Sequence, residues 1–178
     1  MILIKKILLL ILILNVTILV YSQKAISPDG NFKYSIPYKN ETGTDLLKTM
    51  QKMNPLIIDI HIIKTKKGNI PLALSKYEGG ESLPIETILE KYVNSVKSTS
   101  NSRVLETKSY KKNGIIFHRK ITAIRFNKNN ETISVMYYFK ESKETKNMYE
   151  LKISSDIADS TDIKNYLEKV ASTVTFKK

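Results

Sequence analysis

The chain has 178 residues, of which 29 are lysine or arginine and 17 are aspartate or glutamate, giving a formal net charge of +12. It has no cysteine, which excludes disulfides, a thiolate nucleophile, cysteine metal sites and the cysteine-linked lipid anchor of bacterial lipoproteins. Most of the basic residues are lysines, which suit solubility or loose attraction to anionic surfaces better than a specific phosphate site. The abundance of Lys, Ile and Asn is also typical of an AT-rich genome. The positive charge is therefore either functional or a product of composition.

Residues 1–22 have the pattern of a secretory signal peptide. A lysine pair precedes an apolar run over residues 7–20, and the small residue Ser22 precedes Gln23. The run is shorter than the roughly 20 apolar residues that span a bilayer. We therefore expect export, with cleavage near Ser22/Gln23 and a single periplasmic or extracellular domain over residues 23–178. An uncleaved membrane anchor is the alternative.

The first half of this domain is expected to mix strands with one short helix. Alternating apolar and polar residues predict a half-buried strand over residues 31–36. Thr44 or Asp45 is expected to begin a helix that ends before Pro55. Two further strand-like segments flank a Lys-Lys-Gly-Asn turn. They are residues 56–63 and 70–77. The inward stripe of the helix is expected to be Leu46, Leu47, Met50 and Met53.

The second half begins with a predicted amphipathic helix over residues 83–97, capped by Ser82. Four strand-like segments follow, and the short turns between them, such as Asn113-Gly114, predict an antiparallel meander. Asp162 is expected to open a terminal helix. The four strands are residues 104–111, 115–126, 132–140 and 148–154. The inward residues of the terminal segment are Ile163, Leu167, Val170 and Val174.

This order predicts an α+β fold, with a mainly antiparallel sheet packed against helices that are apolar on one side. Whether the helices cover one face of the sheet or both stays open. The segments "NFKYSIP", "LIIDIHII", "IPLALSKY", "IETILEKYVNSVK" and "DIKNYLEKVASTVTF" occur in an order that resembles the PsbP-like superfamily, including the bacterial DcrB-like and DUF1795-type exported domains. The resemblance covers residues 30–176. It implies an α-β-α sandwich that acts as an accessory or binding module, and it brings no set of catalytic residues.

No catalytic, cofactor-binding or metal-binding motif stands out. His61 and His118 each lie within a predicted strand, where a hydrogen-bonded, partly buried histidine is the ordinary interpretation. The acidic stretch from Asp156 to Asp162 lacks the spacing of a calcium loop, and we interpret it as a loop and N-cap. We expect no cofactor and no enzymatic activity.

One aromatic and basic segment is a candidate surface contact. It consists of Tyr138, Lys140, Lys143 and Lys146. Core and cross-strand packing of the aromatic residues is the alternative interpretation.

The sequence therefore predicts an exported, non-catalytic accessory or binding module of the bacterial cell envelope. Its partner is expected to be an unidentified envelope protein or an anionic surface, with no specific nucleic acid. An exported enzyme with a dispersed carboxylate or tyrosine site is the competing hypothesis.

Overall fold

The computed structural model describes residues 23–78, 87, 90, 94, 101–125, 131–140, 147–156 and 160–177. The expected signal segment lies outside them. So does the helix expected at residues 83–97, apart from Thr87, Glu90 and Asn94, which are helical. Within the described ranges, no helix is both long and apolar enough to cross a membrane.

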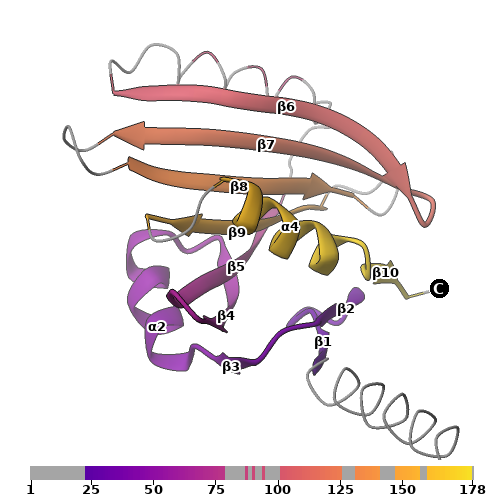
Figure 1. Cartoon of the computed structure of the whole chain (residues 1–178). Coiled ribbons are helices and arrows are strands. Elements are labelled where there is room, and N and C mark those ends of the chain that lie inside the picture. Colours follow the sequence, from indigo (N-terminus) through magenta and orange to yellow (C-terminus); the bar gives the residue numbers. More distant parts are fainter. Residues whose placement is uncertain are drawn as a thin grey trace, which may run out of the picture.

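Seven strands form one antiparallel sheet in the order β3-β4-β5-β9-β8-β7-β6 (Figure 1). The last four are the predicted meander. The turn between β6 and β7 has positive φ angles at Asn113 (52°) and Gly114 (80°), as the tight hairpin turn predicted from this pair requires. The strands are β3 (Asn40–Thr42), β4 (Ile57–Thr65), β5 (Gly68–Glu78), β6 (Ser102–Lys112), β7 (Ile115–Arg125), β8 (Glu131–Phe139) and β9 (Asn147–Ser155).

A second, three-stranded antiparallel sheet has the order β1-β2-β10. Its strands are β1 (Gln23–Ile26), β2 (Phe32–Ile36) and β10 (Thr175–Phe176). Only β2 was predicted. Strands β1, β10 and β3 are two to four residues long, too short to show a period, and their extended conformation depends on pairing with a neighbour.

Two helices are described over their whole length, α2 (Thr44–Met53) and α4 (Ser160–Ala171). The apolar stripe of α4 is fully buried as predicted, because α4 packs against β8, β9 and β2 (Figure 1). Helix α2 packs against β4 and has no fully buried residue. The expectation that Met53 faces inward is wrong, since it is 72% exposed at the end of the helix.

The main core lies between one face of the large sheet, the small sheet and α4. Phe32 of β2 is completely buried, and its ring contacts Phe139 of β8, Tyr149 of β9 and Phe176 of β10 at centroid distances of 5.4, 4.8 and 5.5 Å. These aromatic contacts join the two sheets.

Leu167 is at the centre of the buried side of α4, with no exposed surface. We predict that Leu167→Ala lowers the free energy of unfolding by about 2–5 kcal/mol, the range for truncating a buried leucine. Asn165→Ala, at an exposed position of the same helix, is expected to change it by no more than about 0.5 kcal/mol. Urea denaturation measures both. Equal losses would contradict the docking of α4 on the sheet.

Candidate functional site

The two faces of the meander carry different chemistry. Along β7, Phe117 and Ile121 face the main core, and Arg119 lies on the same side. His118, Lys120 and Thr122 face the opposite side, where a smaller apolar cluster also lies. That cluster is Met136, Tyr138 and Met148, with Tyr77 against it. The second face is thus buried yet rich in polar groups.

Lys120 is the most unusual group on this second face, because its side chain is completely buried. Burial lowers the pKa of Lys120 to about 8, and the charge of Glu150 opposes part of that shift. Glu150 is itself buried and accepts a hydrogen bond from the hydroxyl of Tyr77 at 3.0 Å. A lysine with a lowered pKa is a candidate nucleophile or base where it borders a cavity. The amine of Lys120 has no contact with solvent, so we assign it a structural role.

A second polar cluster joins the two sheets. The Tyr34 hydroxyl of β2 donates to Asp59 Oδ2 of β4 at 2.9 Å, and His61 Nε2 lies 3.2 Å from the same oxygen and 3.3 Å from the hydroxyl. Burial alone would raise the pKa of Asp59, but the hydrogen bond and charge of His61, with the Tyr34 hydrogen bond, bring that pKa below its usual value. Burial beside Asp59 raises the pKa of Tyr34. Asp59 is therefore a stable carboxylate, and Tyr34 a hydrogen-bond donor.

The turn before β2 is tied to the large sheet in a similar way. The Tyr149 hydroxyl donates to Asp29 Oδ2 at 2.6 Å, and Asn31 Nδ2 donates to both groups. Lys76 Nζ lies 3.4 Å from Asp29 and 2.9 Å from Glu78. Burial acts to raise the pKa of Asp29, but these hydrogen bonds outweigh it and the pKa is lowered.

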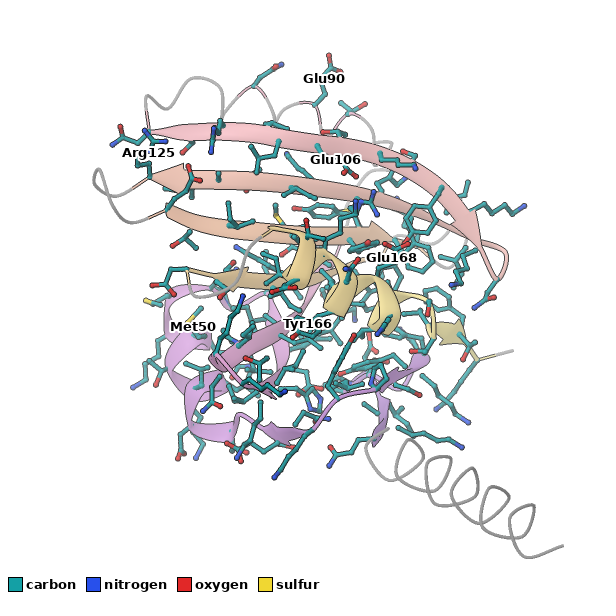
Figure 2. The ribbon with its side chains drawn as sticks, viewed as in Figure 1. Met50, Glu90, Glu106, Arg125, Tyr166 and Glu168 are labelled. Atoms are coloured by element: carbon teal, nitrogen blue, oxygen red, sulfur yellow. The ribbon has the colours of Figure 1, made fainter. Side chains whose placement is uncertain are left out.

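Arg119 is the centre of a fourth cluster, between the sheet and α4. Its guanidinium is buried, binds Glu106 of β6, donates to the Tyr137 hydroxyl at 3.3 Å and lies 3.3 Å from Glu168 of α4. Figure 2 labels the two glutamates, Glu106 by β6 and Glu168 on α4. Lys164 adds a contact of 3.5 Å to Glu106. Each carboxylate in the cluster is therefore neutralised by a cation.

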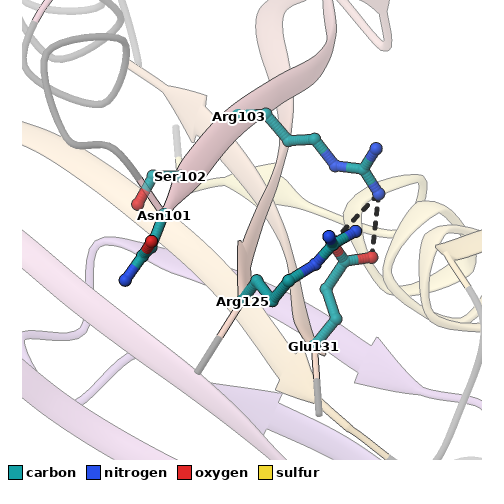
Figure 3. A pocket seen from close by; sticks show the side chains of 5 residues that line it. All are labelled: Asn101, Ser102, Arg103, Arg125 and Glu131. Carbon is teal, nitrogen blue, oxygen red and sulfur yellow. Dashed lines mark hydrogen bonds and ion pairs between the residues drawn. The ribbon is translucent and has the colours of Figure 1, made fainter. Parts of the chain in front are cut away.

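A solvent-open hollow lies where β6 begins and β7 ends (Figure 3). Its volume is about 360 Å³. Arg103 forms two hydrogen bonds with Glu131, at 3.0 and 2.9 Å, and the guanidinium of Arg125 lies 3.9 Å from the same carboxylate. Asn101 and Ser102 are the other described residues of the lining. This set offers hydrogen-bond donors to a small anionic group, and Glu131 is already engaged by an arginine, so it is not poised as a base for Ser102.

The histidines fit the interpretation made from the sequence. His61 and His118 are both buried in strands, and His118 Nδ1 lies 2.8 Å from the Ser109 hydroxyl. Among the described residues, no group of three or more His, Cys, Asp or Glu side chains is arranged to hold a metal ion.

The aromatic and basic surface contact is corrected in part. Tyr138 is buried against Met136, because strand alternation turns it into the smaller apolar cluster. It is therefore no surface contact, and the packing interpretation holds for it. Lys140 is half-buried at the end of β8. Lys143 and Lys146 lie outside the described residues.

Sequence reasoning missed the four polar clusters. One signal was present for one of them: Asp59 and His61 are two positions apart in a strand, which puts both side chains on one face. The partners of Arg119 lie on β6, β8 and α4, and nothing in the local sequence indicates them.

Comparisons with known proteins identify solved structures that have the same architecture. No protein-family model matches the sequence, and no curated protein matches it. Three solved structures share the fold over most of their length. Cyanobacterial PsbP (CyanoP) from Synechocystis sp. PCC 6803 matches with a TM-score of 0.58 and 9% sequence identity, over 88% of this chain and 93% of that chain. Protein PA94 from Pseudomonas aeruginosa matches with a TM-score of 0.54 and 7% identity, over 89% of this chain and 99% of that chain. The Ran-binding protein Mog1p from Saccharomyces cerevisiae matches with a TM-score of 0.57 and 8% identity, over 86% of this chain and 94% of that chain.

The chain therefore has the PsbP/Mog1p-like fold, whose described part here is an antiparallel seven-stranded sheet, a small second sheet and the helices α2 and α4. This confirms the predicted α+β class and the PsbP-like resemblance. At such low identity the likeness defines the fold and leaves function to the site.

The lowered pKa of Lys120 makes stability depend on alkaline pH. Between about 8 and the ordinary value of 10.5 the folded state has released the proton while the unfolded chain still holds it, so stability rises with pH. We predict that wild type gains about 1–3 kcal/mol relative to Lys120→Met between pH 7 and pH 10. Urea denaturation of both proteins across this range measures the gain. Parallel pH profiles would contradict the lowered pKa of Lys120.

Asp59 gives the opposite dependence at acid pH. Its pKa in the folded state lies below 3.8, so its contribution is complete above that value and is lost as pH falls through the folded pKa. We predict that Asp59→Asn is less stable than wild type by about 1–3 kcal/mol at pH 7, and that this difference shrinks between pH 5 and about pH 2. Asp45→Asn, at an exposed position of α2, is the control and is expected to cost no more than about 1 kcal/mol. A constant difference across the range would contradict the lowered pKa of Asp59.

Proposed function

We propose that this protein is an exported, non-catalytic binding module of the cell envelope. The main observation behind this proposal is that ionisable groups at the contacts between elements are paired within the fold. Asp29, Asp59, Glu106 and Arg119 are engaged by oppositely charged or hydrogen-bonding partners on other segments of the chain. Such pairs hold the architecture together, and they leave no activated nucleophile beside the hollow in the part of the chain that the structure describes.

The fold supports the same proposal by analogy. One of the similar structures, Mog1p, is named as a Ran-binding protein, so this architecture serves binding in at least that case. The hollow at Arg103 and Arg125 is a polar surface that suits contact with an anionic group of a partner. An enzyme with two converging carboxylates would need both in one pocket. Among the described residues that line the hollow, Glu131 is the single carboxylate.

Export is supported by the order of segments along the chain. The expected cut falls between Ser22 and Gln23, and Gln23 is already paired with Ile36 at the start of β1. The main core lies within residues 32–174. Removal of residues 1–22 would thus leave both sheets and the core complete.

The proposal is tested by fusing the full chain to alkaline phosphatase lacking its own signal, in a Gram-negative host. We expect active phosphatase outside the cytoplasm, and a mature chain beginning at Gln23 by N-terminal sequencing. Inactive phosphatase would overturn export. A mature chain that keeps residues 1–22 would support the anchor instead.

The non-catalytic part is tested with the purified domain and a panel of ester, glycan and peptide substrates. We expect rates no higher than the uncatalysed background. Turnover at an enzyme-like rate of about 1 per second or more would refute this part, provided that it disappeared with a variant of the hollow such as Arg125→Ala.

A further inference from the structure

The outer face of the small sheet is basic. Phe32, Tyr34 and Ile36 of β2 point into the core, so Lys33 and Ser35 point outward. Residues paired with them share that outer face, and they include Lys24 opposite Ser35 and Ile26 opposite Lys33.

A third lysine lies beside this face. The backbone N–H of Lys177 donates to the carbonyl of Asn31 at 2.9 Å. The Nζ of Lys177 lies next to Gly30, 3.5 Å from the position that a Cβ on this glycine would take. All three lysines are exposed, and none forms an ion pair with an acidic side chain of the described residues. We name Lys24, Ile26, Lys33 and Lys177 the basic face.

The surroundings of the basic face keep it positive. Asp29, in the adjacent turn, binds Tyr149 and Lys76 of the large sheet instead. The turn between β6 and β7 lies near this face, because Asn113 donates to the carbonyl of Ser172, and the hydroxyl of the next residue, Thr173, bonds Ser35. The exposed Lys111 and Lys112 directly precede that turn and add positive charge. Two exposed lysines elsewhere on the surface are paired with acids instead, Lys64 with Glu41 at 2.5 Å and Lys67 with Asp162 at 3.2 Å.

The basic face also has an apolar point and a defined position in the chain. Ile26 is 55% exposed among the lysines. Lys24 follows Ser22 by two residues, so the apolar run over residues 7–20 ends directly before this face with no linker. Any export of the chain through a membrane by this run brings the basic face out next to the bilayer. Lysines surrounding an apolar side chain match the interfacial zone of an anionic bilayer.

We propose that the basic face is a docking surface for an anionic lipid bilayer. This inference rests on the proposed function, because only an exported domain meets envelope lipid from that side. Lysines near an anionic surface each strengthen binding about fivefold. Three of them, with Ile26 at the interface, give weak and reversible attachment that holds the domain in one orientation.

The test uses residues 23–178 and co-sedimentation with vesicles of phosphatidylcholine, with and without phosphatidylglycerol. We expect binding to the anionic vesicles only, lost at about 1 M salt, where the Debye length falls to about 3 Å. The test variant is Lys24→Gln/Lys33→Gln/Lys177→Gln. The matched control, Lys48→Gln/Lys52→Gln/Lys66→Gln, removes the same charge from exposed lysines of α2 and the β4–β5 turn.

The test variant is expected to weaken binding by more than about tenfold, and the control by less than about threefold. Ile26→Ser, which leaves the charge unchanged, is expected to weaken binding measurably. Equal losses in the two triple variants would overturn the proposal, since net charge and not the basic face would then drive attachment. Absence of binding by wild type to anionic vesicles would also overturn it. Melting temperature confirms that each variant is folded.

The two proposals fail separately. If the phosphatase fusion is active and the vesicle test fails, export stands and the docking surface falls. If the vesicle test succeeds and the fusion is inactive, the basic face binds lipid but the proposed export falls.

Discussion

The contact of Phe32 with aromatic rings from three other strands is the constraint on which the two-sheet arrangement depends. Phe32 lies 4.8 Å from Tyr149 and 5.4 Å from Phe139, both on the large sheet. Because these rings fill the space between the sheets, the small sheet has one position in which β2 buries its apolar side. The hydrogen bonds of Tyr34 to Asp59 and of Tyr149 to Asp29 then fix the register between the sheets at two points.

Strand β7 is buried on both faces, and this affects the two adjacent cations that it carries. Arg119 and Lys120 are adjacent in sequence, buried, and on opposite faces. Arg119 keeps its charge because two glutamates and a tyrosine surround its planar group. Lys120 responds by a lowered pKa. Neighbouring cations therefore meet the same cost of burial in two different ways, and neither is left available to a substrate.

The sequence was informative where a pattern is local. Alternation predicted β2 and the meander β6 to β9, and the helical spacing of Ile163, Leu167 and Val170 predicted the buried side of α4. Strands β1, β3 and β10 could not be predicted, because they are defined by distant partners. The exposure of Met53 shows the limit of the helix pattern, since an apolar stripe does not say how much of it a neighbour covers.

The candidate site was less predictable than the fold, for the same physical reason. Residues such as Glu106, Arg119 and Glu168 look like ordinary surface charges in sequence and become a cluster only when β6, β7 and α4 meet. The basic surface is easier to predict from the sequence, because alternation in β2 puts Lys33 on the opposite face from Phe32 and Tyr34. Its extent still depends on β1 and β10, the strands that sequence did not indicate.

The distribution of polar groups connects this fold to the kind of function it supports. Charged groups in the interior are paired with partners on other elements, so they are not available to bind a ligand. The lysines on the outer face of the small sheet are exposed and form no ion pair with an acid of the described residues, so they stay open to an external surface. Because that face directly follows the apolar N-terminal run in sequence, the proposed docking surface lies next to the segment that is expected to direct export.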